Sequence, residues 1–415
     1  MRAQEDRASA GERRLGSVPW GALAGLGPAL DGPLGEVLAG APAERVLDRF
    51  LRANRGLSRE ARQAVKEAVF GVAVWRRRLA WQAGASPSTS MPPAVVLLAL
   101  LLRDLARFPG PAALLGLDPR LLPPPRPPPA DLATRHSLPD WLAATLEREA
   151  GAEAAALADA LNLPGPVALR PNLLRTTPVA LARRLAAEGV EARPGALVPS
   201  ALVVTSLRPN LYGLGALREG LFEVQDEGSQ RAGALLAARP GERVLDLCAG
   251  AGGKALQLAA DVGAGGAVHA CDPDAERLAR LAVRARRAGA AGIVRIEGAA
   301  PPGGLTVDAA LVDAPCSELG ALRRGPDARF RIDPGSFAAL PALQLELLRA
   351  AARHVRPGGR LVYATCTLRR EEDEDVALAF SRAEPAFQLA EASRTWPHRQ
   401  GCDGFYMALF QRKNS

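Results

Sequence analysis

Two cysteines stand in the most informative parts of this sequence. Cys316 ends the apolar run LVDAPC, and Cys366 ends the apolar run LVYATC. Short apolar runs of this kind predict strands buried in a sheet. A thiolate can add to C6 of a pyrimidine ring, which makes C5 able to attack a methyl group. The two positions therefore indicate a covalent step on a pyrimidine, while the alternative for each is a small buried apolar residue.

A glycine-rich segment precedes both cysteines. The residues VLDLCAGAGGKALQLA (244–259) predict a strand, a turn and the start of a helix. Glycines let a ligand approach the backbone, and a helix N-terminus offers unpaired N–H groups. Asp272 ends the next predicted strand, where an acid can accept hydrogen bonds from ribose hydroxyls. The loop lacks the G-x-G-x-x-G pattern, which favours S-adenosylmethionine over NAD; a tight turn without a ligand is the alternative.

These segments need a sheet that brings several strand ends together. From Gly241 onward, predicted strands and helices alternate along the chain. Such alternation indicates a mostly parallel sheet with helices on both faces. Ligands bind beyond the carboxyl ends of the strands in such sheets, so we expect both cysteines and the glycine-rich loop to face one crevice.

The chain before this sheet divides into a helical part and a small mixed part. Residues 43–107 carry apolar residues at helical spacing, with Ser58 as an expected N-cap. The prolines of LLPPPRPPP (121–129) predict an extended spacer and a domain boundary. We expect four regions, which are a helical domain over 40–120, a proline-rich linker over 121–137, a helical segment plus a small α+β module over 138–235, and a Rossmann-like domain over 236–415.

Composition narrows the cellular setting and the partners. The net charge of +8 and the pI near 9.8 favour a polyanionic partner. The longest apolar stretch, Ala94–Leu102, is too short to span a bilayer, and we see no secretory signal at the N-terminus. Five scattered cysteines fit a reducing compartment, and no cluster has the spacing of metal ligands. We expect a cytoplasmic protein without a metal.

The C-terminal half closely resembles the bacterial small-subunit rRNA cytosine-C5 methyltransferases of the RsmB (Sun/Fmu) type. The resemblance rests on the segments EVQDEGSQ (223–230), VLDLCAGAGGK, DAPCS, GALRRGPDARFR (320–331), YATCTLRREEDE and DGFYMALF. With the regions that precede these motifs, it covers about residues 40 to 412. It implies a multidomain protein with an all-α NusB-like N-terminal RNA-binding domain, a small α+β module and a C-terminal α/β Rossmann-like S-adenosylmethionine-dependent methyltransferase domain.

The same resemblance implies roles for individual residues. Cys366 would be the nucleophile, and Cys316 would help to release the methylated product. DNA cytosine methyltransferases use the cysteine of the Pro-Cys motif instead, so the reverse assignment stays open. Asp313 looks like the family's acid that contacts the target base. The residues that would hold S-adenosylmethionine are Cys248, Ala249, Gly250, Ala251, Gly252, Gly253, Lys254, Asp272 and Asp313.

The chain departs from the family pattern at three places. Gly250 and Ala251 stand where the family loop usually reads Ala-Pro. The third strand, RIEGAAPPGG, lacks the family's cofactor-contacting Asp and offers only Glu297. The segment CSELG replaces the usual C-S-x-T-G behind Cys316. The residue that contacts the adenine side of the cofactor is therefore unassigned.

The charged segments around the cysteines give two further expectations. The segment LRRGPDARFR carries four arginines whose position suits phosphate contacts beside a flipped cytosine, namely Arg323, Arg324, Arg329 and Arg331. The charge run RREEDED after Cys366 predicts the solvated start of a helix, with a role in positioning the loop as the alternative. The expected substrate is small-subunit rRNA, either naked or partly assembled. We expect the protein to act as a monomer and not to bind a membrane.

The predicted function is S-adenosylmethionine-dependent methylation of C5 of a specific cytosine in small-subunit rRNA through a covalent Cys–C6 adduct. Two other functions stay open. One is a non-catalytic RNA-binding or antitermination-type factor with a relic methyltransferase fold, which the intact Cys316, Cys366, Asp313 and Lys254 argue against. The other is a small-molecule or dinucleotide enzyme on a related fold, which the basic charge and the extra N-terminal domains argue against.

Overall fold

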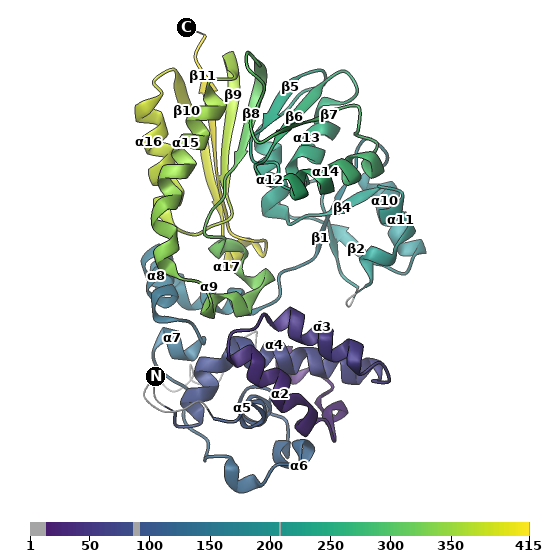
Figure 1. Cartoon of the computed structure of the whole chain (residues 1–415), viewed down its shortest axis with the longest axis vertical. Helices are drawn as coiled ribbons and strands as arrows, with labels where there is room; N and C mark the ends of the chain where they lie inside the picture. Colours follow the sequence, from purple (N-terminus) through teal and green to yellow (C-terminus); the bar gives the residue numbers. More distant parts are fainter. Residues whose placement is uncertain (1–13, 86–91, 207–208, 415) are drawn as a thin grey trace. The chain divides into compact units, whose positions relative to one another are not determined.

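The computed structural model of the protein describes residues 14–85, 92–206 and 209–414 (Figure 1). Contacts within the chain divide it into two compact units. The first unit runs to Pro164 and also includes Leu322–Asp333, and the second comprises Gly165–Ala321 and Pro334–Ser415.

The first unit is helical throughout its described part. Its helices are α2 (Gly27–Leu38), α3 (Ala43–Ala53), α4 (Arg59–Gln82), α5 (Ala94–Leu100), α6 (Pro111–Leu115), α7 (Leu132–Arg135), α8 (Asp140–Ala150) and α9 (Ala154–Asn162). After α5 the chain continues through a wider helical turn, Leu101–Leu105. The prediction of a helical N-terminal part is therefore confirmed, and its first described helix begins before residue 40.

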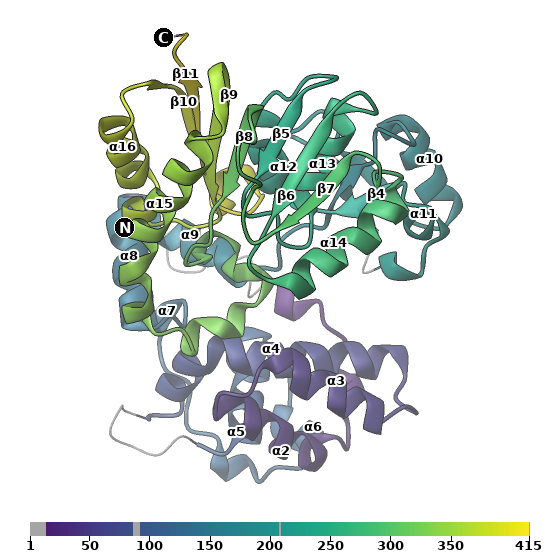
Figure 2. The same cartoon turned by 45° about the horizontal axis from the view of Figure 1, so that its top comes forward.

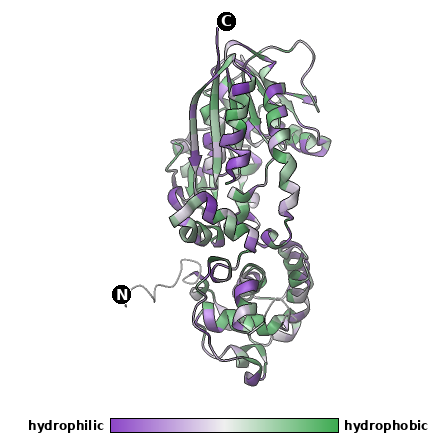
Figure 3. Cartoon of the chain, turned by 90° about the vertical axis from the view of Figure 1, so that its left-hand side faces the viewer, coloured by the Kyte–Doolittle hydropathy of each residue, from purple (hydrophilic) through white to green (hydrophobic). Residues whose placement is uncertain are grey.

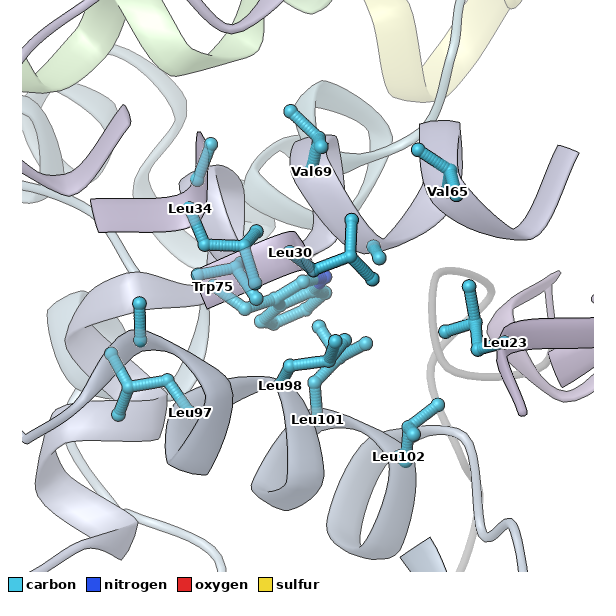
Figure 4. Close-up of a cluster of buried hydrophobic side chains, with 14 of the residues drawn as sticks. Leu23, Leu30, Leu34, Val65, Val69, Trp75, Leu97, Leu98, Leu101 and Leu102 are labelled. Atoms are coloured by element: carbon cyan, nitrogen blue, oxygen red, sulfur yellow. The ribbon is translucent and has the colours of Figure 1, made fainter. Parts of the chain in front are cut away.

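The core of this unit forms around the long helix α4. Ser58 caps α4 as expected, because its side chain accepts a hydrogen bond from the backbone N–H of Ala61. The face predicted from apolar spacing is buried, including Val65, Val69 and Leu79. Figure 4 shows Val65, Val69 and Trp75 of α4 among leucines of α2, α5 and the turn that follows it.

The proline-rich segment does not separate the two units. It lies within the first unit, because α7, α8 and α9 follow it and belong to the same unit. Helix α4 reaches these later residues directly: the backbone N–H of Arg77 donates to Ser137 Oγ at 3.0 Å, and its guanidinium donates to the carbonyl of Leu138. The Arg126 guanidinium also lies over the Trp81 ring, 4.2 Å from its centre. These contacts tie the spacer back onto α4, so the boundary falls at Pro164.

The second unit begins with a small antiparallel sheet. Its strands lie in the order β2-β3-β1-β4 and are β1 (Ala168–Pro171), β2 (Ala192–Pro194), β3 (Leu202–Val204) and β4 (Phe222–Val224). The helices α10 (Pro178–Ala187) and α11 (Gly215–Arg218) pack with it through Leu181, Leu185 and Leu217. This is the small α+β module that the sequence predicts.

The rest of the second unit is a seven-stranded sheet between helices, in the order β10-β11-β9-β8-β5-β6-β7. Its strands are β5 (Arg243–Asp246), β6 (Ala267–Cys271), β7 (Val294–Gly298), β8 (Val307–Asp313), β9 (Val355–Thr365), β10 (Phe387–Thr395) and β11 (Phe405–Arg412). Its helices are α12 (Glu227–Leu235), α13 (Gly253–Val262), α14 (Ala275–Ala288), α15 (Leu340–Ala352), α16 (Glu374–Ala383) and α17 (Pro397–Gln400). All neighbours are parallel except β11, which runs antiparallel to β9 and β10. The prediction of a mostly parallel Rossmann-like sheet is confirmed.

Helices cover both faces of this sheet. On β5, Val244 packs with the core of α13 and α14, while the next residue, Leu245, packs with the core of α15 and α16. The side chains of a strand alternate between faces, so near-continuous apolar strands supply two cores. Figure 3 shows hydrophilic and hydrophobic residues interspersed along the helices, as expected for helices with one packed face.

Buried polar contacts join the small module to the large sheet. Arg170 of β1 donates to the carbonyl of Gly253 at the start of α13, and Asn172 donates to the carbonyl of Ala288 at the end of α14. Glu223 of β4 pairs with Arg284 and Arg287 of α14. Figures 1 and 2 show α10 and α11 toward the β7 edge of the sheet, away from β10. The module is therefore fixed beside the glycine-rich turn.

The strand order reverses between β5 and β8, since β6 and β7 lie beyond β5 while β9 lies beyond β8. In open α/β sheets, ligands bind at such a reversal, outside the carboxyl ends of the strands. Asp246 ends β5, Asp313 ends β8 and Cys366 follows β9 directly. No helix in the described ranges combines the length and the apolar character needed to cross a membrane.

Candidate active site

A cavity of about 670 Å³ lies at these strand ends. The predicted site residues that line it are Cys248, Ala249, Gly250, Ala251, Gly253, Lys254, Asp272, Asp313, Cys316 and Cys366. They come from four strand ends and from the start of α13. The structure thus brings together what the sequence places up to 118 residues apart, and of the predicted cofactor residues Gly252 alone is not part of the lining.

The glycine-rich turn depends on left-handed backbone conformations. Gly250 has φ +52° and Gly252 has φ +91°. A Cβ atom on Gly252 would lie 2.1 Å from Leu281 Cδ1, so close packing of α13 against α14 requires glycine there. Gly252 therefore shapes the turn from behind, while Gly250, Ala251 and Gly253 present their backbone to the cavity.

Asp272 is anchored to this turn. Its Oδ2 accepts a hydrogen bond from the backbone N–H of Gly250 at 2.9 Å, and its Oδ1 accepts one from the N–H of Asp274 at 2.8 Å. Both bonds hold the carboxylate at the mouth of the glycine-rich turn. The position suits contact with a ribose, and the side chain still lines the cavity.

The two cysteine sulfurs are in direct contact. Cys316 Sγ lies 3.4 Å from Cys366 Sγ, and both residues line the cavity. The backbone holds their loops together, because the N–H of Gly320 donates to the carbonyl of Cys366 at 2.9 Å. A Cβ atom on Gly320 would lie 2.1 Å from the carbonyl oxygen of Gly404, so only glycine permits this approach.

The contact makes the two thiols unequal. The hydrogen bond with Cys366 raises the pKa of Cys316 well above its usual range, and burial raises it further. Cys316 therefore keeps its proton near neutral pH and can donate it toward the sulfur of Cys366. A thiol that donates a hydrogen bond stabilises a thiolate on its neighbour.

A buried lysine balances the acids on the cavity floor. Lys254 Nζ donates to Asp313 Oδ2 at 2.6 Å, and the Phe405 ring lies beneath the ammonium, 5.2 Å away. Asp246 is almost fully buried, and within the described residues neither oxygen of its carboxyl group makes a hydrogen bond. Burial raises the pKa of Asp246 to about 7, the charge of Asp313 adds to the rise, and Lys254 opposes it. Asp246, the last residue of β5, is a site residue that is not among the predicted ones.

The charges of the residues that line the cavity show whether S-adenosylmethionine fits it. The acids that line it are Asp246, Asp272, Asp274, Asp313 and Glu318, against the cations Lys254 and Arg277. An acidic cavity with an unpartnered buried carboxyl group suits a ligand that carries an ammonium and a sulfonium group. It disfavours the pyrophosphate of a dinucleotide. The residues present therefore fit S-adenosylmethionine.

The structure contradicts the expectation that the charge run after Cys366 is the solvated start of a helix. Glu372 and Asp373 are fully buried. Glu372 Oε2 accepts hydrogen bonds from the backbone N–H of Ser317 at 2.9 Å and from Gln344 Nε2 at 3.0 Å. Its Oε1 accepts hydrogen bonds from Ser317 Oγ at 2.6 Å and from Arg369 at 3.1 Å. The carboxylate is therefore enclosed by donors from the loops that follow both cysteines.

Asp373 is held in a similar way. It pairs with Arg394 of β10 at 2.8 Å, and Thr365 donates to its Oδ1. Burial raises the pKa of Asp373 well above its usual range, although Arg394 opposes the rise. The two acids anchor both ends of the loop that carries Cys366, because Thr365 immediately precedes the cysteine.

The third strand offers no acid to the cavity. Glu297 of β7 binds His269 of β6 instead, with Oε1 2.6 Å from Nδ1. The cavity wall near the end of β7 is Ala299, with Arg277 of α14 nearby. No acid of β7 is therefore among the residues that line the cavity.

The four arginines proposed for RNA contact have different surroundings. Their segment, Leu322–Asp333, belongs to the first unit, where Asp327 accepts a hydrogen bond from the N–H of Ala43. Arg329 is fully buried and donates to Asn162 Oδ1 at 2.6 Å, and burial lowers its pKa to about 10. Arg323 is also buried, whereas Arg324 and Arg331 are exposed. The RNA contact stays a prediction for the exposed pair, and burial excludes Arg323 and Arg329 from such a contact in this conformation.

No group of three or more metal-ligating side chains occurs among the residues that the structure describes. All five cysteines are free thiols. The titratable groups that line the cavity are thiols, carboxylates, one ammonium group and one guanidinium group.

Comparison with known proteins finds two family models, and one of them crosses the boundary at Pro164. Residues 233–411 match the family model described as 16S rRNA methyltransferase RsmB/F, and residues 138–209 match a model described as the ferredoxin-like domain of RsmF/B-like methyltransferases. The ribosomal RNA small subunit methyltransferase B of Thermus thermophilus is 35% identical over 320 residues, which cover 74% of this chain and 73% of that protein. A probable ribosomal RNA small subunit methyltransferase B of Synechocystis is 35% identical over 304 residues, 68% of each chain.

Solved structures share the fold at lower identity. A methyltransferase homologue from Pyrococcus horikoshii superposes with a TM-score of 0.60 at 23% identity, over 68% of this chain and 98% of that one. NSun6 from Pyrococcus horikoshii, solved with SFG, gives a TM-score of 0.61 at 21% identity, over 67% of this chain and 98% of that one. At this identity the likeness concerns the fold alone.

Proposed function

Because this chain belongs to the RsmB/F family of 16S rRNA methyltransferases, with S-adenosylmethionine as methyl donor, we propose that it methylates C5 of a cytosine in small-subunit rRNA through a covalent adduct. The observation that carries the proposal is the 3.4 Å contact between the sulfurs of Cys316 and Cys366 in a cavity lined by the glycine-rich turn. Methyl transfer to a nitrogen or an oxygen needs no thiol, whereas C5 of cytosine is not nucleophilic until a thiolate has added to C6.

Cys366 adds to C6 as the thiolate. A bond forms between its sulfur and C6, and the electron pair of the C5–C6 double bond moves into the ring toward N3. N3 takes up a proton from solvent as this charge arrives, and Asp313, held in place by Lys254, accepts a hydrogen bond from the resulting N3–H and so stabilises the adduct. S-adenosylmethionine, when bound, would supply an electrophilic methyl group: the electron pair returned to C5 would form the new carbon–carbon bond while the sulfonium–methyl bond breaks, S-adenosylhomocysteine leaves and N3 returns its proton to solvent.

Cys316 completes the reaction. While Cys366 is a thiolate, the hydrogen bond with it raises the pKa of Cys316. Once Cys366 is a neutral thioether, this largest cause disappears while burial remains, so the pKa of Cys316 falls and its proton can pass to solvent through the cavity. Its thiolate then removes the proton from C5, the C5–C6 double bond forms again, and the bond between C6 and the Cys366 sulfur breaks. The opposite assignment of the two cysteines is the competing mechanism.

The other side chains of the cavity hold the methyl donor. Asp246 provides a carboxyl group at the end of β5, Asp272 provides one directly after β6, and Gly250, Ala251 and Gly253 provide backbone. The N-terminal unit is proposed to be NusB-like and to bind RNA, with exposed Arg324 and Arg331 at the surface. We propose a monomer that works in the cytoplasm, where small-subunit rRNA is found.

The test of this function is transfer of a labelled methyl group from S-adenosylmethionine to unmodified small-subunit rRNA, followed by digestion to nucleosides. The expected product is 5-methylcytidine at one position. Label in any other nucleoside would contradict the C5 assignment. Binding of rRNA without transfer would favour the non-catalytic RNA-binding factor.

A further inference from the structure

A second surface cavity of about 610 Å³ lies in the second unit between α14 and the small module. Its walls come from α14, from β4 and from the short turn Leu211–Gly213. Ala251 of the glycine-rich turn lines both this cavity and the candidate active site. The two cavities are therefore adjacent, on either side of a single turn of backbone.

An exposed aromatic ring stands at this cavity. Tyr212 is 79% exposed, although the other two tyrosines of the chain, Tyr363 and Tyr406, are buried. Its turn is well anchored, because Leu211 is buried and Asn210 Oδ1 accepts a hydrogen bond from the N–H of Gly213. The turn therefore holds an aromatic ring in solvent beside the cavity, where a base can stack on it.

Apolar and basic side chains extend the surface beside the ring. Val224 and Val283 line the cavity and are 39% and 58% exposed. The α14 residues in its wall recur at the spacing of one helix face; they are Ala279, Arg280, Val283, Arg284 and Arg287.

The charge of the cavity is positive. Arg284 and Arg287 share the buried carboxylate of Glu223, which is the acid in the cavity lining, and Arg284 also donates to the carbonyl of Ala251. Arg280 is exposed and makes no hydrogen bond or ion pair within the described part of the chain. One acid for three arginines leaves uncompensated positive charge, and Arg280 presents it to solvent.

We propose that this surface binds a nucleotide of the rRNA strand that flanks the target cytosine. The base stacks on the Tyr212 ring and contacts Val224 and Val283, and its phosphate binds the Arg280 guanidinium. Stacking on an exposed aromatic ring together with a basic contact to the backbone is how single-stranded RNA is held. The adjacency through Ala251 explains why a strand whose cytosine enters the active site would pass here.

The inference rests on the proposed function, since it assumes that RNA reaches the active site. An acidic protein segment would also match the charge, but it would not need a flat ring beside a cavity of nucleotide size. The proposed partner is therefore RNA. The test of the proposal measures RNA binding directly, without methyl transfer.

The experiment compares variants for binding to a transcribed, unmodified small-subunit rRNA fragment over a range of salt concentrations. The variants are Arg280→Glu, Tyr212→Ala and Tyr212→Phe, with Arg286→Glu as the control. Arg286 lies on the same helix, is exposed and does not line the cavity. Binding of S-adenosylmethionine and the melting temperature report whether each variant is folded.

Arg280→Glu is expected to weaken RNA binding about tenfold and to lower the slope of log K against log salt by about one or two. Tyr212→Ala is expected to weaken binding about tenfold with little change in slope, while Tyr212→Phe stays close to the parent because it keeps the ring. Ultraviolet crosslinking should join RNA to the peptide that contains Tyr212.

The inference is overturned if Arg280→Glu and Tyr212→Ala bind like the parent, or if Arg286→Glu weakens binding as much as Arg280→Glu. A parent protein that binds RNA but transfers no methyl group would contradict the proposed function alone. The comparison among the variants would still decide the role of the surface.

Discussion

Both carboxylate oxygens of Glu372 accept hydrogen bonds from Ser317, one from its backbone N–H at 2.9 Å and one from its hydroxyl at 2.6 Å. Ser317 follows Cys316, and Glu372 lies six residues after Cys366. Ser317 Oγ also lies 2.6 Å from Thr367 Oγ1. A single buried acid thus connects the loops of both cysteines, and we expect it to position the two sulfurs.

Glu372→Gln tests this connection. The amide keeps the volume but replaces one acceptor by a donor that points at the Ser317 and Arg369 donors. We expect methyl transfer to fall about ten- to a hundredfold, because misplacing a nucleophile by a fraction of an ångström is that costly. The affinity for S-adenosylmethionine should stay near that of the parent, since Glu372 does not line the cavity.

Glu371→Gln is the matched control, because Glu371 is the neighbouring residue and its side chain is 42% exposed. The same loss of activity in both variants would show that the charge of the run matters and not its buried geometry. Unchanged activity in Glu372→Gln would contradict the positioning role.

Gly320→Ala tests the close approach of the two loops. The added Cβ would lie 2.1 Å from the carbonyl oxygen of Gly404 and 2.9 Å from that of Cys366, so the backbone must move. We expect the free energy of unfolding to fall by about 1–3 kcal/mol and methyl transfer to fall with it. Chemical denaturation and transfer assays on the same preparation would measure both.

Gly325→Ala serves as the comparison for Gly320→Ala. Nothing lies within 4 Å of a Cβ atom at that position, and its φ of −141° is open to any residue. Its stability should stay within about 1 kcal/mol of the parent. If the two alanine variants were equally stable and equally active, the close approach at Gly320 would have no consequence.

The pKa of Asp246 near 7 gives a pH dependence to cofactor binding. Below pH 7 the free protein holds a proton on Asp246, and a cationic ligand must displace that proton, so binding weakens as the pH falls. Between pH 5.5 and pH 7 the affinity for S-adenosylmethionine should rise about tenfold. Isothermal titration at several pH values would measure it.

Asp246→Asn removes the titrating group. Its affinity should be lower than that of the parent at pH 7 and almost independent of pH below that value. A pH dependence that survives in Asp246→Asn would assign the titration to another group and contradict the role of Asp246.

The strand ends that carry the chemistry could be predicted from the sequence. Cys316 and Cys366 follow apolar runs, and parallel strands bring their carboxyl ends to one edge of a sheet, so the shared crevice follows from pattern alone. The glycine-rich turn was also predictable, because Gly250 and Gly252 adopt the positive φ that glycine permits.

Burial of Glu372 could not be predicted in the same way. A run of charges normally faces water, and nothing in the pattern of RREEDED marks one acid as buried. Its partners Ser317 and Gln344 lie 55 and 28 residues away in the sequence. Only the three-dimensional arrangement shows that four donors meet at one carboxylate.

That Leu322–Asp333 belongs to the helical unit could not be predicted from the sequence either. The segment follows the loop of Cys316 directly, so its arginines read as part of the same site. In the structure its contacts are with the first unit, where Arg329 binds Asn162 and the carbonyl of Leu161. An arginine buried by a partner 167 residues away carries no local sequence signal.

The most direct test of the account concerns the roles of the two cysteines. Parent protein, Cys316→Ser and Cys366→Ser would be incubated with S-adenosylmethionine and unmodified small-subunit rRNA, then separated on a denaturing gel. Cys402→Ser, a buried cysteine outside the cavity, is the control. We expect Cys316→Ser to accumulate a covalent protein–RNA complex, because the adduct forms but cannot be resolved, and Cys366→Ser to form no complex and no product. A complex that accumulates in Cys366→Ser and is absent in Cys316→Ser would contradict the account and assign the nucleophile to Cys316.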